Sequence, residues 1–304
     1  MIKSIFFIHK SNSDYLKYVL NQARYSNPKV KIYLIGDESN NKYNFLTHAN
    51  ISDYFESSEN FKKIYKHFST NDYNYELLCF QRWFILKDFI KKNNIDGSFF
   101  YFDSDLMVYS DLQKDYDLLK KYKFSVCKTY GPQNTFFLNY SVLEEFCDFI
   151  EFMYKDSNFD REMNRIYKEM RDQDLPGGIS DMYALWRFYE KNQENAVDLG
   201  EIIDDGVFDN KINEDYGFET ACGIKKLQWI KKEPYCFYPP LGRKIKLKAV
   251  HFQGGYKSII RANYKGKYNP DILLSETIFY LKKIKFYLGS IVKFLIKKRN
   301  LGEK

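Results

Sequence analysis

Residues 97–105 read GSFFYFDSD, an almost continuous run of aromatic residues that leads directly into two aspartates separated by a serine. The run from Gly97 to Phe102 predicts a strand buried on both faces, as in a sheet covered by helices. Asp103 and Asp105 then follow the carboxyl end of that strand, which is where open α/β sheets bind their ligands. This stretch therefore predicts both an α/β fold and the place of its functional site.

Strand and helix patterns alternate around this run. Short apolar segments that predict strands lie at 4–8, 30–35, 124–128, 135–138 and 245–250. Helical spacing of apolar residues occurs at 14–24, 60–68, 76–92, 111–121, 141–154, 160–171 and 180–191. The alternation in the first half of the chain predicts an α/β sandwich with a mainly parallel sheet.

The composition is that of a folded domain with a sizeable core. Of 304 residues, 44% are hydrophobic and 19% are aromatic, and so much apolar ring surface excludes a disordered chain. Lys and Arg number 47 against 40 Asp and Glu, a net charge of +7 that is concentrated in the last thirty residues. This modest excess suits phosphate-bearing ligands or an anionic membrane surface, and we expect no nucleic-acid partner.

The cysteines and the N-terminus point to a compartment. Five cysteines without a CxxC pair are typical of reduced thiols in a cytosolic protein. The N-terminal segment MIKSIFFIHKSNSDYL has too short an apolar run for a signal peptide, and no stretch of about 18 apolar residues predicts a membrane span. We therefore expect a cytoplasmic protein.

Asp103 and Asp105 are candidate metal ligands. Residues two apart in extended backbone point the same way, so both carboxylates can reach one hard divalent cation, Mn²⁺ or Mg²⁺. Two other Asp-x-Asp patterns occur, at 115–117 inside a predicted helix and at 172–174 in a charged surface segment. The alternative for Asp103 and Asp105 is a strand-end turn with solvated carboxylates.

A second polar segment, HFQGGYK at 251–257, follows the predicted strand at 245–250. His251 can complete a carboxylate-rich Mn²⁺ site. Gly254 lets the backbone approach a phosphate, and Lys257 supplies positive charge to it. The alternative for His251 is a structural histidine.

The segment FFYFDSDLMVYSDL at 99–112, with His-x-x-Gly-x-x-Lys at 251–257, resembles the GT-A-fold glycosyltransferases, especially glycosyltransferase family 8. The resemblance implies a GT-A-like, Rossmann-type α/β/α sandwich. It also implies a UDP-sugar donor, Mn²⁺ held by Asp103, Asp105 and His251, and retention of anomeric configuration. Gly254 and Lys257 would contact the diphosphate.

The same resemblance implies further nucleotide-sugar contacts. Arg82 lies on the long helix before the Asp-Ser-Asp segment, where such enzymes place a basic residue near the donor. Ser104 lies between the two aspartates, and His9 ends the first strand, where the uridine pocket would be. Asn134 precedes a strand as a sugar-contacting asparagine does, although the usual Asn-x-Gly pattern is absent.

Asp181 resembles the active-site acid of the family, which begins a helix in an Asp-Gln pair. Met182 stands here in place of the glutamine. The segment Asp172-Gln173-Asp174 contains the family's Asp-Gln pair, but it lies in a charged surface segment. Asp172 and Asp174 therefore stay open as alternatives. We predict Asp181 as the catalytic residue.

The last segment, 271–304, alternates apolar residues with clustered lysines and predicts a helical, basic amphipathic tail. Such a tail can lie on an anionic bilayer. The alternative is a helix that packs on a catalytic domain over 1–270. We predict peripheral attachment to the inner face of the cell membrane.

The predicted function is that of a hexosyltransferase-type glycosyltransferase in bacterial surface polysaccharide synthesis, acting on a saccharide or lipid-linked saccharide acceptor. One alternative is a metal-dependent nucleotidyltransferase, which usually needs a glycine-rich loop after the first strand, and IFFIHKSNSDY has no glycine there. The other is a membrane-attached saccharide- or nucleotide-binding protein without catalysis.

Overall fold

The computed structural model describes residues 1–127, 131–270, 272–274, 277, 280–281, 284–285 and 288. The chain forms two compact units, 1–265 and 266–304, and the elements below belong to the first. The predicted boundary at residue 270 stays a prediction. Within the described ranges, no helix is long and apolar enough to cross a membrane.

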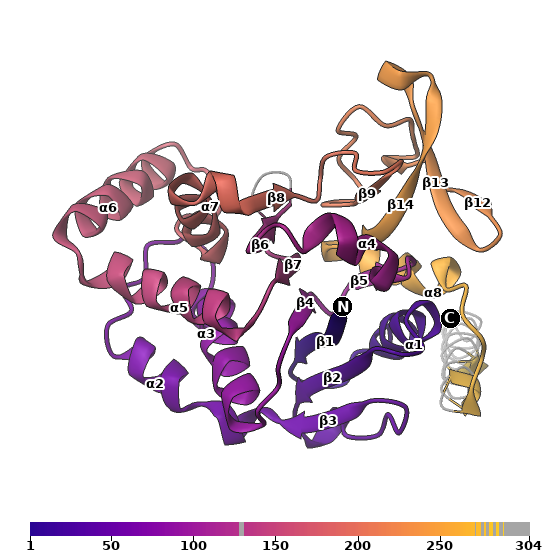
Figure 1. Ribbon diagram of the computed structural model, residues 1–304, viewed down its shortest axis with the longest axis horizontal. Coiled ribbons are helices and arrows are strands. Elements are labelled where there is room, and N and C mark those ends of the chain that lie inside the picture. The colour runs from indigo at the N-terminus through magenta and orange to yellow at the C-terminus, as the bar shows by residue number, and fades with distance from the viewer. Residues whose placement is uncertain are drawn as a thin grey trace, which may run out of the picture. The chain divides into compact units, whose positions relative to one another are not determined.

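A seven-stranded sheet forms the centre of the first unit (Figure 1). Its strands, in spatial order, are β3 (Thr47–Asn50), β2 (Lys31–Gly36), β1 (Ile2–His9), β4 (Ser98–Phe102), β7 (Asn134–Phe137), β6 (Phe124–Val126) and β8 (Ala196–Asp198). Only β7 runs against its neighbours, so the sheet is mainly parallel as predicted.

Helices cover both faces of this sheet (Figure 1). On one face lie α2 (Glu56–Lys62), α3 (Tyr73–Lys92), α5 (Tyr140–Lys155), α6 (Ser157–Asp172) and α7 (Asp181–Lys191). On the other lie α1 (Leu16–Ser26), α4 (Leu112–Leu119) and α8 (Ile260–Asn263). The predicted fold class, a GT-A-like α/β/α sandwich, is therefore confirmed in its layers.

The aromatic strand β4 explains why both faces of the sheet are packed against other elements. Phe99 and Tyr101 belong to the same core cluster as α3, whereas Phe100 and Phe102 stack on each other with ring centroids 5.1 Å apart. Phe100 also stacks on Phe208, at 5.8 Å. Alternate side chains of a strand point to opposite faces, so the four consecutive aromatic residues of β4 require apolar neighbours on both faces.

A second sheet of five strands brings the C-terminal part of the first unit to the site. It contains β12 (Gln228–Ile230), β13 (Glu233–Tyr238), β14 (Arg243–His251), β5 (Leu106–Val108) and β9 (Gly206–Phe208). β14 runs antiparallel to β5, with His251 paired to Leu106. The metal-ligand candidates of two distant segments are thus brought together by one strand pairing.

The remaining elements are short. β10 (Thr220–Ala221) and β11 (Ile224–Lys225) form a hairpin. Short 3-10 helices are η1 (Glu38–Asn40), η2 (Ile51–Tyr54), η4 (Gln193–Asn195), η5 (Pro239–Leu241) and η6 (Gly254–Ile259).

One helix boundary was predicted wrongly. The pattern at 60–68 predicted a helix there, but α2 begins at Glu56 and ends at Lys62. Beyond α2 the chain is held at Phe68 instead, where its carbonyl accepts the amide hydrogen of Ile179 at 2.8 Å. Gly178 permits this pairing, because a Cβ there would lie 2.3 Å from that carbonyl oxygen.

Candidate active site

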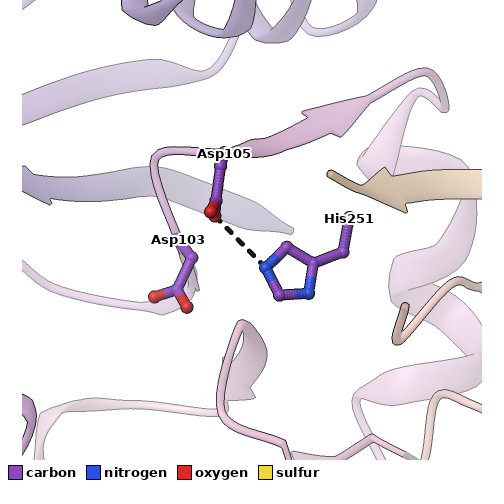
Figure 2. A group of neighbouring side chains, drawn as sticks. All are labelled: Asp103, Asp105 and His251. Atoms are coloured by element: carbon purple, nitrogen blue, oxygen red, sulfur yellow. Dashed lines mark hydrogen bonds and ion pairs between the residues drawn. The ribbon is translucent and has the colours of Figure 1, made fainter. Parts of the chain in front are cut away.

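Asp103 and Asp105 lie in the tight turn between β4 and β5, and His251 ends β14 beside them (Figure 2). The amide of Leu106 donates to the carbonyl of Asp103 at 3.0 Å, which closes the turn. One ligand atom from each of Asp103, Asp105 and His251 lies within 4.8 Å of the others. The structure therefore brings together the three predicted metal ligands.

The two ring nitrogens of His251 have different partners. Nδ1 lies 2.6 Å from the carbonyl oxygen of Asn210, and Nε2 lies 3.2 Å from Oδ1 of Asp105. A carbonyl only accepts hydrogen bonds, so Nδ1 must carry a hydrogen, and Nε2 is the nitrogen left for a metal. Burial lowers the pKa of His251, but the hydrogen bond and charge of Asp105 outweigh this, so the pKa is raised.

Lys257 reaches the same carboxylate from η6. Its Nζ lies 3.2 Å from Oδ2 of Asp105. The residue Asp105 is only 8% exposed. Burial raises the pKa of Asp105, but hydrogen bonds and charge from His251 and Lys257 more than offset this, so the pKa is lowered. Gly254 begins η6 with φ of +57°, a conformation that favours glycine, and no atom lies within 4 Å of the place of its absent Cβ. The backbone at Gly254 is thus open to a ligand.

Arg82 links Asp103 to Asp181. Its Nη1 donates to Oδ1 of Asp103 at 2.7 Å, and its Nε donates to Oδ2 of Asp181 at 2.8 Å. Arg82 Nη2 also donates to Asp181 Oδ2, and Trp83 Nε1 donates to it at 2.9 Å. Asp181 is 2% exposed, so the structure places the predicted catalytic residue beside Arg82 with one oxygen held by three donors.

The predicted nucleotide contacts at the end of β1 lie near the metal-ligand turn. His9 Nδ1 lies 2.8 Å from Oγ of Ser104, and its Nε2 lies 3.1 Å from Oγ of Ser13. Burial, together with the charge of Lys257, lowers the pKa of His9. His9 and Ser104 are therefore neighbours across the ends of β1 and β4.

Other predicted residues lie away from this group. Asn134 is fully buried at the start of β7, and its Nδ2 lies 3.5 Å from the carbonyl oxygen of Asp209. Among the residues described, it is not part of the pocket wall. Asp172 ends α6 with its side chain 69% exposed, and Asp174 follows it, so the alternatives to Asp181 also lie outside that wall.

The site opens into a pocket of about 790 Å³, a size typical of ligand-binding sites. Its wall includes the metal-ligand candidates, Arg82, Asp181, Met182, Gly254 and Lys257. It also includes residues that were not predicted from the sequence: Tyr75, Glu76 and Cys79 on α3, and Asn210, Lys211 and Asn213 after β9. Asp209 and Asn210 follow the short apolar strand β9 as Asp103 follows β4, and this position could have marked Asn210 as a candidate.

No family model and no curated protein matches the chain in sequence. Solved structures do resemble it. The bifunctional glycosyltransferase WbbM has a TM-score of 0.51 at 10% identity, over 91% of this chain and 51% of that one. The galactosyltransferase LgtC, solved with donor and acceptor sugar analogs, has a TM-score of 0.45 at 11% identity, over 88% and 97% of the two chains. Mouse xyloside xylosyltransferase 1 has a TM-score of 0.45 at 9% identity, over 66% and 85%.

The likeness to WbbM concerns the fold, and the chain spans about half the length of that protein. The chain shares its fold with WbbM, a glycosyltransferase, as the resemblance in the sequence implied. The chemistry of this chain has to be argued from its own site.

Proposed function

We propose that the chain is a metal-dependent glycosyltransferase that moves a hexosyl group from a UDP-sugar to a saccharide acceptor. One observation carries the proposal: Asp103, Asp105, His251 and Lys257 meet at one edge of the pocket, although they come from two segments far apart in the sequence. Two carboxylates, an imidazole and an ammonium form a suitable set for a cation and the diphosphate that it accompanies.

The three candidate ligands fit Mn²⁺ or Mg²⁺. Their ligand atoms are close enough to share one cation, and Asn210 fixes the hydrogen on Nδ1 of His251 so that Nε2 is available. A bound divalent cation would supply positive charge to a departing diphosphate. In the metal-free protein, hydrogen bonds and charge from His251 and Lys257 lower the pKa of the buried Asp105 carboxyl, which favours its charged form.

Other residues of the chain would bind and orient the donor. We assign diphosphate contacts to Lys257 and to the backbone at Gly254, and nucleoside contacts to His9 and Ser104. Arg82 would hold Asp103 in place from the other side. We also assign the active-site acid to Asp181, and we infer retention of anomeric configuration from the family resemblance. Asn134 is buried and would not contact a sugar itself. It would affect sugar binding only by positioning the segment that contains Asp209.

The tail supports a proposal about location. In the second unit, the described residues Leu274, Leu281 and Leu288 are 64%, 59% and 57% exposed. Exposed leucines in a lysine-rich segment suit the interface of an anionic membrane. We propose that this unit holds the protein at the inner face of the cell membrane, where a lipid-linked acceptor for surface polysaccharide would lie. Much of 271–304 lies outside the described residues.

The function is tested by incubating the full-length protein with a panel of nucleotide sugars, with and without Mn²⁺, and measuring release of nucleoside diphosphate. We expect release from UDP-sugars that depends on the metal. Mass spectrometry of acceptor mixtures then identifies the sugar added. Release of pyrophosphate from a nucleoside triphosphate and a sugar phosphate would instead support a nucleotidyltransferase, and binding without turnover would support the non-catalytic alternative.

A further inference from the structure

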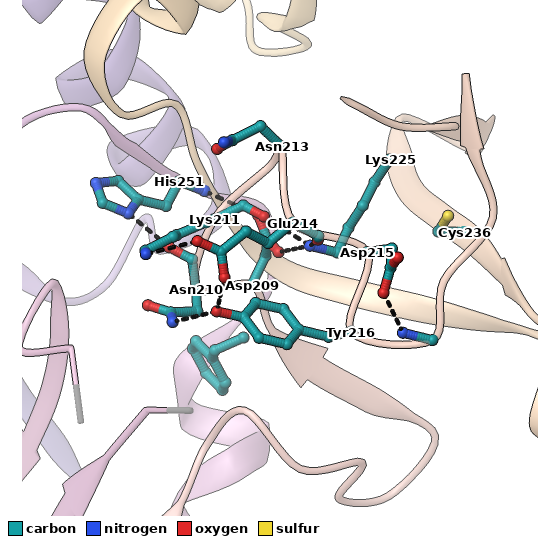
Figure 3. Close-up of polar contacts among 12 residues, drawn as sticks. Asp209, Asn210, Lys211, Asn213, Glu214, Asp215, Tyr216, Lys225, Cys236 and His251 are labelled. Atoms are coloured by element: carbon teal, nitrogen blue, oxygen red, sulfur yellow. Dashed lines mark hydrogen bonds and ion pairs between the residues drawn. The ribbon is translucent and has the colours of Figure 1, made fainter. Parts of the chain in front are cut away.

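The loop from Asp209 to Glu214 supports His251 at three points (Figure 3). The main-chain amide of His251 lies 3.4 Å from Oδ2 of Asp209, and its ring Nδ1 lies 2.6 Å from the carbonyl oxygen of Asn210. The amide of Ile212 donates to the carbonyl of His251 at 3.1 Å. The position of His251 therefore depends on where this loop lies.

Lys225, on the β10–β11 hairpin, contacts the 209–214 loop through its ammonium group (Figure 3). Its Nζ lies 2.8 Å from Oδ1 of Asp209, and both side chains are 1% exposed. It donates to the carbonyl of Lys211 at 2.6 Å and also to the carbonyl of Glu214. An ammonium has three donors, and here three oxygens of one loop accept from it.

The loop also reaches the other metal-ligand segment. Gln133 donates through Nε2 to the side-chain oxygen of Asn210, and its own carbonyl accepts the amide hydrogen of Asp103 at 2.9 Å. One continuous set of hydrogen bonds therefore joins Lys225, the 209–214 loop, His251 and Asp103. Displacement of the loop would change the geometry on both sides of the cation position.

We propose that Lys225 is a positioning residue that fixes the 209–214 loop and thereby sets His251 at metal-binding distance from Asp105. The inference rests on the proposed metal site. Among the described residues, Lys225 neither lines the pocket nor contacts the predicted ligands. Its effect therefore passes through Asp209 and the carbonyls of Lys211 and Glu214. Groups that orient a metal-bound histidine affect metal affinity by about 10- to 100-fold when they are removed.

The test compares two buried lysines in the full-length protein. Lys225→Met removes the ammonium that binds the 209–214 loop. Lys248→Met removes the ammonium that pairs with Asp115 at 2.5 Å, a buried ion pair of the same kind outside the pocket wall. Mn²⁺ affinity is measured by electron paramagnetic resonance of the free ion, and folding by circular dichroism and thermal unfolding. We expect both variants to lose stability, but only Lys225→Met to bind Mn²⁺ about ten-fold more weakly or worse.

A double variant covers the case in which Lys225→Met does not fold. Lys225→Met with Asp209→Asn removes the carboxylate that would otherwise lose its ion-pair partner, yet the carbonyls of Lys211 and Glu214 still lack their donor. We expect this protein to fold and to bind Mn²⁺ weakly, while Asp209→Asn alone binds it more tightly than the double variant. Wild-type affinity in the folded double variant would overturn the positioning role and leave the metal site intact. A wild-type protein that binds no Mn²⁺ would overturn the metal site and this inference together.

Discussion

The ammonium of Lys257 lies 3.2 Å from Oδ2 of Asp105, so in the metal-free protein the lysine contacts the carboxylate that a cation needs. Lys257→Ala should therefore have two opposite effects. It should weaken UDP binding in the presence of Mn²⁺ by about ten-fold, because a charged contact to the diphosphate is lost. It should also tighten the binding of Mn²⁺ alone, because the lysine no longer competes with the cation for Asp105. Calorimetric titrations measure both, with Lys226→Ala as an exposed control; unchanged UDP affinity would show that Lys257 does not contact the nucleotide.

Asp103 is expected to be essential for metal-dependent turnover. Asp103→Ala should reduce Mn²⁺-dependent UDP release by roughly 100-fold or more, the scale on which loss of one electrostatic partner affects a transition state. Asp117→Ala is the matched control, because Asp117 belongs to another Asp-x-Asp pattern and its side chain is 80% exposed. A fully active Asp103→Ala protein would contradict the assignment of the metal site.

Arg82 should matter for stability as well as for the site. Arg82→Met leaves Asp181 buried without its main charge partner, which costs about 3–5 kcal/mol of unfolding free energy. Urea denaturation measures this loss, and Arg187→Met, which removes a 26% exposed arginine, should cost less than about 1 kcal/mol. Adding Asp181→Asn to Arg82→Met should restore much of the loss. If the second substitution has no effect, Asp181 is not the group that Arg82 neutralises.

Glu76 gives a stability effect that depends on pH. The residue is 2% exposed, and among the described residues its Oε2 has no hydrogen-bond partner. Burial raises its pKa, although a hydrogen bond from Asn71 opposes the shift. The folded state therefore binds the proton more tightly than the unfolded state, so the wild type loses stability as pH rises above the ordinary glutamate pKa.

Glu76→Gln removes that charge. We expect the variant to have a melting temperature about 2 °C higher than the wild type at pH 8, with the difference vanishing toward pH 4. Thermal unfolding across this range is the measurement. A difference that is constant with pH would mean that Glu76 is equally easy to ionise in both states.

Removal of 271–304 tests the membrane proposal. The truncated protein should no longer float with liposomes that contain acidic lipid, and raised salt should detach the full-length protein because it screens the lysines. UDP release should persist, since all the proposed site residues precede the deletion. Equal flotation of the two proteins would exclude the membrane role, and loss of UDP release would indicate that the segment packs on the catalytic domain.

The sequence predicted those parts of the site that rest on local patterns. Asp103 and Asp105 were found because a buried aromatic strand ends immediately before them, and His251 because it follows another apolar run. β5 and β9 were not predicted: each has only three residues, and β5 follows the turn of Asp103 and Asp105 so closely that it does not stand out as a separate apolar run. Asn210 and Lys225 act through contacts between distant segments, which no spacing rule reveals. Asn134 was expected at a sugar, but its position in the middle of the sheet buries it.

The pairing of β14 with β5 also sets the order of events when the chain is made. Ribosomes deliver the N-terminus first, so Asp103 and Asp105 emerge while β14 has yet to be synthesised. A nascent chain that stops before His251 has both carboxylates but neither the imidazole nor Lys257. We therefore expect cation capture to follow synthesis of every strand of the central sheet, all of which precede His251 in the chain.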